Sequence, residues 1–159
     1  MKKRIAFISE HASPLAILGG VDAGGQNVYV AQLAMHLARI GYAIDIFTRW
    51  EDASQPKLVK WLPGVKVIHI KAGPVTYIPK EQLLPYIPEF TKDVLSYIRE
   101  SGSRYDLVHA NFFMSAMAAS ELKKVLGIPY LVTFHALGLV RRIHQMEADK
   151  FPAERLQIE

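Results

Sequence analysis

Short apolar runs of strand length alternate with segments of helical periodicity along most of the 159 residues. The runs are rich in Val, Ile, Phe and Tyr, which favours strands, whereas apolar spacing of three and four residues favours helices. The predicted strands are 4–9, 42–48, 65–70, 105–109 and 129–134, and the predicted helices are 26–40, a segment from Pro88 to about Ser101, 115–126 and about 144–159. Such alternation with short links is typical of an α/β fold, in which helices cover both faces of a parallel sheet.

The composition describes one globular domain without strong bias toward a polyanionic partner. Half of the residues are hydrophobic and 21% are charged, and the net charge is +4. The basic residues are dispersed, so a small phosphorylated ligand is a better match than nucleic acid. The chain has no cysteine, which excludes disulfides and fits a cytoplasmic location. No apolar run reaches the length of a membrane span.

A glycine-rich segment, 19–27, separates the first predicted strand from its helix. Glycine lets a ligand approach the backbone closely, and a helix start presents unpaired N–H groups with a partial positive charge. The segment therefore predicts an anion site, with phosphate as the expected group. It lacks both G-x-G-x-x-G and the lysine of a P-loop, which disfavours a dinucleotide-binding oxidoreductase. The simpler interpretation is a connecting loop without a ligand.

The sequence also resembles a known enzyme family over essentially its whole length. The similar stretches are 11–49 with its GGQNVY motif, 72–84 (AGPVTYIPKEQLL), 105–115 (YDLVHANFFMS) and 133–138 (TFHALG). They resemble the amino-terminal domain of retaining, nucleotide-sugar-dependent glycosyltransferases of family 4. That family includes sucrose synthase, sucrose-phosphate synthase and the inositol-phosphate N-acetylglucosaminyltransferase of mycothiol synthesis.

The resemblance implies a Rossmann-like domain, residues 1–159, that forms the acceptor-binding half of a two-domain GT-B fold. The carboxy-terminal half, which holds the nucleotide sugar in this family, is expected to be missing from this chain. The full-length enzyme would transfer a hexose, with a UDP-sugar as the expected donor, to a sugar or sugar phosphate in sucrose synthesis or a related pathway. No cofactor and no metal are expected, and the isolated chain is expected to be nearly inactive.

Several residues match family positions that contact the ligands. Gly24 and Gly25 match glycines whose amides approach the donor diphosphate, and His135 matches a histidine near the reacting sugar. Asn27 matches an acceptor contact, although asparagine is equally suited to the start of a helix. His11 and His109 are expected near the same cleft.

The expected acceptor-phosphate site combines Lys80 with Arg155, for which Arg141 and Arg142 are alternatives. The alternative for Lys80 is a solvated side chain at a helix start. Phe112 stands at an acceptor-binding position where phosphate-using members tend to have tyrosine. Ala136 likewise stands where they have serine or threonine. Each change removes a hydroxyl, so a free sugar competes with a sugar phosphate as the predicted acceptor.

A different class of function is also open, namely a non-catalytic module that binds a phosphorylated small molecule or a partner protein. The last predicted helix stops in mid-pattern at Glu159, which favours a chain cut from a longer protein. If a second domain is missing, the surface that it would cover is a candidate for self-association.

Overall fold

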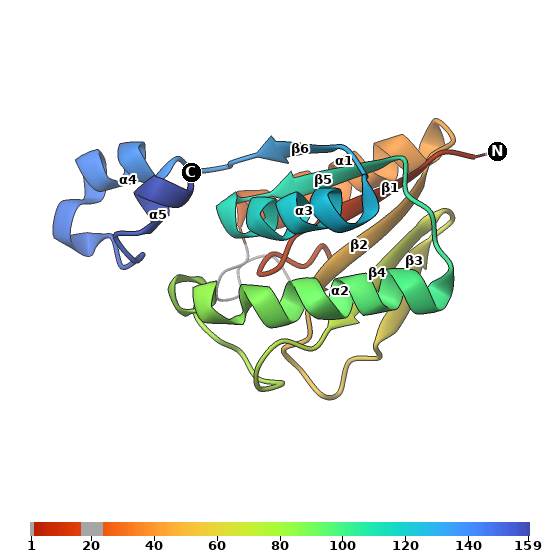
Figure 1. Cartoon of the computed structure of the whole chain (residues 1–159), viewed down its shortest axis with the longest axis horizontal. Helices are drawn as coiled ribbons and strands as arrows, with labels where there is room; N and C mark the ends of the chain where they lie inside the picture. The colour runs from red at the N-terminus through yellow and green to blue at the C-terminus, as the bar shows by residue number, and fades with distance from the viewer. Residues whose placement is uncertain (1, 17–23) are drawn as a thin grey trace.

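The computed structural model describes residues 2–16 and 24–159, and it builds them around a six-stranded sheet of order β3-β4-β2-β1-β5-β6 (Figure 1). The strands are β1 (Arg4–Ile8), β2 (Ala43–Arg49), β3 (Leu58–Leu62), β4 (Val65–Ile70), β5 (Leu107–Asn111) and β6 (Tyr130–Thr133). The helices are α1 (Gly25–Arg39), α2 (Ile87–Ser101), α3 (Phe113–Leu126), α4 (Gly138–Gln145) and α5 (Arg155–Ile158), with the short 3-10 helices η1 (Lys80–Gln82), η2 (Leu84–Tyr86) and η3 (Met146–Ala148).

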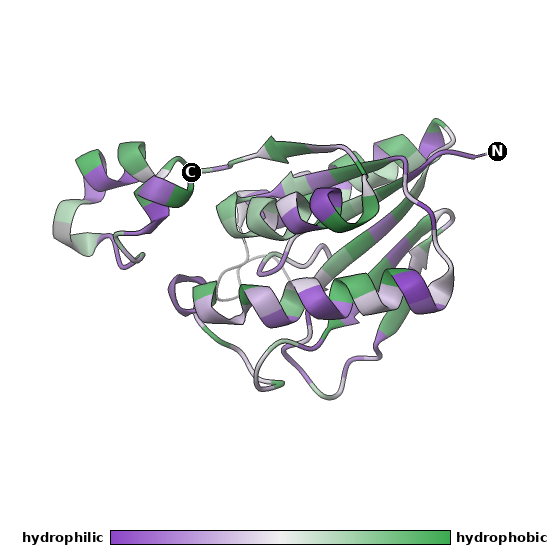
Figure 2. Cartoon of the chain, in the orientation of Figure 1, coloured by the Kyte–Doolittle hydropathy of each residue, from purple (hydrophilic) through white to green (hydrophobic). Residues whose placement is uncertain are grey.

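Helices cover both faces of the sheet, as the alternating pattern predicts. On one face, Val30 and Ala34 of α1 pack on β1, β2 and β4. On the other face, α2 and α3 contribute Phe90, Val94 and Leu122 to a second apolar cluster. The sheet strands are coloured mostly hydrophobic in Figure 2, which is the expected composition of parallel strands buried on both sides. The predicted α/β, Rossmann-like fold class is confirmed.

Two sequence predictions need correction, whereas the remaining helices and strands agree within two residues. Strand β3 was not predicted, and it pairs antiparallel with β4 at the edge of the sheet. A tight turn at Pro63 and Gly64 joins the two, and Gly64 has a φ of 83°. The single helix predicted over 144–159 is wrong, because the chain forms α4, η3 and α5 there. Met146, at φ 47°, ends α4, and Pro152 separates it from α5.

The order of the parallel strands places a crevice between β1 and β5. The chain runs from β1 outward to β2 and β4, then crosses over to β5 and continues to β6 on the other side. Loops therefore diverge beyond the carboxyl ends of β1 and β5, which is where open α/β sheets bind ligands. In Figure 1 this end of the sheet leads through β6 to α4 and α5, which lie beyond it.

Within the described residues, no helix is both long and apolar enough to cross a membrane.

The sheet and its helices leave a groove of about 870 Å³ between α2, α3 and β6. Its lining includes Leu95, Met117, Tyr130 and Phe134, none of which follows β1 or β5 at the crevice.

Candidate functional site

The amino-terminus of α1 opens onto the crevice with exposed backbone. Gly24 and Gly25 are both exposed, and a Cβ atom built on either one would have no atom of residues 2–16 and 24–159 within 4 Å, apart from its chain neighbours and the backbone of α1. Gly24 has φ −149° and ψ −157°, an extended conformation that other residues also adopt. Neither local crowding nor backbone conformation therefore requires glycine here. The glycines leave space beside the first amides of α1, as a ligand that approaches the backbone would need.

Asn27 holds this helix start together. Its Oδ1 accepts a hydrogen bond from the Gly24 amide at 2.9 Å, and its Nδ2 donates to the Ser13 carbonyl oxygen at 2.9 Å. The residue is 4% exposed. The structure thus gives Asn27 the helix-start role, while its contact with an acceptor stays a prediction. Residues 19–23 of the glycine-rich segment lie outside the described residues.

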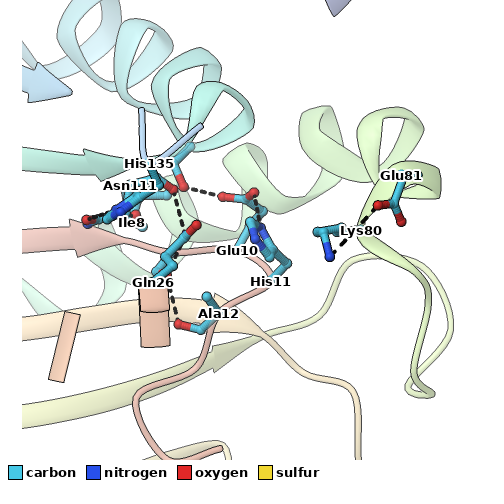
Figure 3. A network of polar contacts seen from close by, with 11 residues as sticks. Ile8, Glu10, His11, Ala12, Gln26, Lys80, Glu81, Asn111 and His135 are labelled. Atoms are coloured by element: carbon cyan, nitrogen blue, oxygen red, sulfur yellow. Dashed lines mark hydrogen bonds and ion pairs between the residues drawn. The ribbon is translucent and has the colours of Figure 1, made fainter. Parts of the chain in front are cut away.

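A polar network joins α1 to the carboxyl ends of β1, β5 and β6 (Figure 3). Gln26 Nε2 donates to Ser9 Oγ at 3.3 Å and to the Asn111 carbonyl oxygen at 3.1 Å. Asn111 Oδ1 lies 3.1 Å from His135 Nε2. These contacts bring the predicted His135 to the helix that begins at Gly25. Sequence reasoning missed Ser9, Gln26 and Asn111. Ser9 ends a predicted strand and Gln26 starts a predicted helix, whereas Asn111 lies two residues beyond the predicted strand 105–109.

A buried carboxylate lies at the carboxyl end of β1, beside this network. Glu10 is 2% exposed, and its Oε1 lies 2.7 Å from His11 Nδ1. Its Oε2 accepts a hydrogen bond from the hydroxyl of Ser115, in the first turn of α3. A buried carboxylate needs such partners, because desolvation of an unpaired charge is costly. His11 also packs edge-on against Phe112, with ring centroids 5.0 Å apart.

The two histidines at β5 and β6 have environments that disfavour a charged ring. Burial lowers the pKa of His109 to about 4, and the nearby His135 adds to this effect. The pKa of His135 is also lowered, first by partial burial and then by His11, with Glu10 opposing. His109 Nε2 lies 2.9 Å from Thr133 Oγ1, so His109 is part of the crevice wall. Both environments therefore favour the neutral form of the ring.

Two residues flank the crevice in a left-handed backbone conformation. Phe112, directly after β5, has a φ of 94°, and His135, two residues after β6, has a φ of 59°. Such conformations are costly for residues other than glycine, and they persist where the surrounding structure holds them. Phe112 is held by burial and by the rings around it. His135 is held by its bond to Asn111 and by the Tyr29 ring at 4.9 Å.

Arg155 is almost completely buried, with 1% exposure, although it carries a charge. Its guanidinium lies 4.5–4.8 Å from the ring centroids of Phe112, Phe113 and Phe151. Nε donates to Glu159 Oε1 at 2.7 Å and Nη2 donates to the Ala136 carbonyl oxygen at 2.5 Å. Nη1 has no partner among the described residues. Arg155 therefore retains an unused donor beside the predicted acceptor residue Phe112.

The other predicted cation, Lys80, joins this cluster through an ionic chain. Lys80 Nζ lies 3.8 Å from Glu81 Oε1, which in turn lies 3.9 Å from Arg141 Nη2. Arg141 stacks on the Phe151 ring that also contacts Arg155. The structure therefore groups Lys80, Arg141 and Arg155 as cations from η1, α4 and α5. Arg142 is exposed and takes no part in these contacts among the described residues.

No His, Asp and Glu side chains in residues 2–16 and 24–159 gather in a set of three or more that could hold a metal ion. A reaction without metal or cofactor stays a prediction, as do the individual contacts of the site residues with ligands. The geometry does show that the described predicted residues surround one end of the sheet. Amide donors, a neutral imidazole and clustered cations suit a ligand that carries hydroxyl and phosphate groups.

Comparisons with known proteins agree with this geometry. The sequence profile of Glycosyltransferase Family 4 matches residues 23–158. The chain is 39% identical over 155 residues to the D-inositol 3-phosphate glycosyltransferase of Corynebacterium urealyticum, covering 98% of this chain and 37% of that protein. It is 37% identical over 157 residues to the protein of the same name from Actinosynnema mirum, again covering 37% of it. The chain thus spans little more than a third of these relatives.

Solved structures give the same picture. Sucrose-phosphate synthase from Thermosynechococcus elongatus matches with a TM-score of 0.91 and 36% identity, over 99% of this chain and 39% of that one. The catalytic domain of Starch Synthase IV from Arabidopsis thaliana matches with a TM-score of 0.53 and 18% identity, which supports the fold alone.

Proposed function

This chain belongs to glycosyltransferase family 4, and from that premise we propose that it is the acceptor-binding half of a retaining glycosyltransferase. The observation that carries the proposal is the meeting of three features at one end of the sheet. These are the open start of α1 at Gly25, His135 beside Asn111, and the cation cluster around Arg155. The Rossmann-like fold is that of the amino-terminal half of a GT-B enzyme.

The proposed acceptor is a phosphorylated polyol or sugar. The relatives named above act on inositol 3-phosphate, and sucrose-phosphate synthase shares the fold at 36% identity. Lys80, Arg141 and Arg155 are the proposed phosphate-binding cations, and the phosphate would compete for them with Glu81, Asp149 and Glu159, which pair with them in this structure. Charge-assisted hydrogen bonds contribute about 1.5–3 kcal/mol each. Phe112 and Ala136 offer no hydroxyl, so the proposal places the phosphate on the cations alone. A free sugar is the alternative that this departure favours.

The proposed donor is a nucleotide diphosphate sugar, with UDP as the expected nucleotide, held by a second domain that this chain does not contain. Departure of the diphosphate leaves an oxocarbenium-like sugar, and the leaving phosphate takes the proton of the acceptor hydroxyl. The amide at Gly25 and the positive end of α1 would stabilise the departing charge, whereas the Gly24 amide already donates to Asn27 Oδ1. The chain itself needs no nucleophile for this front-face substitution. A cytoplasmic location belongs to the same proposal.

The proposal is tested by amide NMR titration of the chain with inositol 3-phosphate, a hexose phosphate, free inositol and NAD. We expect phosphorylated ligands to shift the amide resonances of Lys80, Arg155 and the residues after β5. Lys80→Ala should weaken the affinity for these ligands about tenfold. Lys124→Ala, on the exposed side of α3, is the matched control. Equal binding of free inositol and its phosphate would refute the phosphate site, and a response to NAD alone would refute the transferase.

Full transfer is tested by incubating the chain with a UDP-sugar and inositol 3-phosphate. We expect negligible turnover, because the proposed donor site lies on a separate domain. Turnover by the 159-residue chain would contradict the proposal that the acceptor and the donor bind to separate domains. Binding of phosphorylated ligands without any activity in a two-domain protein would instead favour a binding module.

A further inference from the structure

The side-chain amide of Asn111 has only one orientation that satisfies its surroundings. Asn111 is fully buried, and its Nδ2 lies 3.4 Å from the Ile8 carbonyl oxygen and 3.3 Å from the His109 carbonyl oxygen. Carbonyl oxygens only accept hydrogen bonds, so the NH₂ group must face them. The reverse orientation would place three oxygens against one another in a buried site. Oδ1 of Asn111 is therefore the atom that faces His135.

This orientation fixes the proton on the neighbouring imidazole. Asn111 Oδ1 is an acceptor, and it lies 3.1 Å from His135 Nε2. His135 Nε2 must therefore carry a hydrogen and donate it. In a neutral imidazole the other nitrogen, Nδ1, then holds a lone pair and accepts hydrogen bonds. Nδ1 makes no hydrogen bond to any residue that the structure describes, and His135 as a whole is exposed.

Charged and titratable groups around His135 are consistent with a neutral ring. His11 and Glu10 follow β1, His109 lies on β5 and Tyr29 lies on α1. The pKa of His135 is lowered by partial burial and by His11, and Glu10 only partly opposes this. The ring is also held mechanically, since the Tyr29 ring packs edge-on against it at 77° and the backbone lies at φ 59°. The imidazole is thus fixed in position and in protonation before any ligand arrives.

We propose that Asn111 is a positioning residue that holds His135 as a neutral imidazole with its proton on Nε2, so that Nδ1 accepts a hydrogen bond from a substrate hydroxyl. The lone pair disfavours a phosphate at this point, because two acceptors repel. His135 therefore selects a hydroxyl, and the phosphate is left to the cations around Arg155. The hydroxyl-bearing ligand rests on the function proposed above, whereas the position of the proton does not.

The test is ring ¹⁵N NMR of the histidines in the ligand-free chain, at a pH where the imidazoles are neutral. We expect His135 to show a protonated Nε2 and a bare Nδ1. His36 and His69 are internal controls for the opposite tautomer, because their Nδ1 atoms lie 2.7 Å from the carbonyl oxygens of Gln32 and Pro56. A proton on Nδ1 of His135, with both controls behaving as stated, overturns the proposal.

Asn111→Ala tests whether Asn111 causes this state. We expect its His135 Nε2 proton to exchange with water about tenfold faster than in the unaltered chain, the factor that one net hydrogen bond represents. An unchanged exchange rate in a folded variant overturns the role of Asn111. If the variant does not fold, the unaltered chain decides: its His135 proton must exchange more slowly than that of exposed His144, and equal rates refute the inference. No ligand is present, so failure here leaves the transferase proposal standing.

Discussion

Gly25→Ala should make the chain more stable and at the same time impair anion binding at α1. Apart from the neighbouring backbone, the added methyl group has no atom of the described residues within 4 Å, and Gly25 is the first residue of α1. Replacing glycine by alanine at a compatible position stabilises by about 0.4–1 kcal/mol, mainly because the unfolded chain loses freedom. For a domain of this size we expect Tm to rise by roughly 1–4 °C.

The same methyl group occupies the space that a phosphate would use to reach the first amides of α1. Loss of one charge-assisted hydrogen bond costs about 1.5–3 kcal/mol, which corresponds to roughly ten- to a hundredfold weaker binding. The probe is inorganic pyrophosphate, titrated against the amide resonances of residues 24–27. It needs no second domain, so the anion site is measured alone.

Gly73→Ala is the matched control for the stability arm. Gly73 has a φ of 68°, and a Cβ atom there would lie 2.5 Å from Tyr86 Cε1. This variant should therefore lose stability by about 1–2 kcal/mol, the cost of a left-handed conformation. If Gly25→Ala also lowers Tm, or if it binds pyrophosphate as well as the unaltered chain, the reasoning about an open amide site is wrong.

Three further predictions concern buried ionisable groups. The protein should lose up to about 3 kcal/mol of stability as pH falls from 6.5 to 4, because the folded pKa of His109, about 4, lies below the unfolded value. His109→Gln should reduce this pH dependence of the free energy of unfolding, measured by urea denaturation at each pH. Arg49 donates to three carbonyl oxygens in residues 72–76, so Arg49→Met should lower the free energy of unfolding by about 3 kcal/mol and speed amide exchange in that segment. As the control, Arg39→Met at an exposed position should change stability by less than about 0.5 kcal/mol. Arg155→Lys should lower the free energy of unfolding by about 2 kcal/mol through loss of planar stacking, with Arg142→Lys neutral in the same assay.

The order of strands and helices along the chain could be predicted because each of these elements shows its own apolar periodicity in the sequence. Strand β3 was missed because its five residues are exposed or only partly buried, although the Pro63–Gly64 pair is a hairpin signal. A single helix was predicted over 144–159 because the helical spacing of that segment was given more weight than the proline at 152. A proline there allows a new helix to start but not an old one to continue.

The candidate site was predictable in its position but not in its internal contacts. Loops after the parallel strands β1, β5 and β6 lie at the same edge of the sheet, so His11 and His135 could be expected near the glycines. The bond between His135 and Asn111 depends on side-chain geometry across two strands, which no spacing encodes. The burial of Arg155 likewise depends on Phe112, which lies far away in the sequence.

Phe112 and His135, the two positive-φ residues that flank the crevice, differ in how freely they can be substituted during evolution. Glycine at 135 would relieve the backbone and raise stability while removing the exposed imidazole. Glycine at 112 would instead remove a buried ring from the cluster around Arg155, which costs more than the backbone gains. Selection for stability alone would therefore replace His135 and keep Phe112. In copies of this gene whose products no longer bind the ligand, glycine or asparagine should appear at position 135 well before the β-sheet core changes.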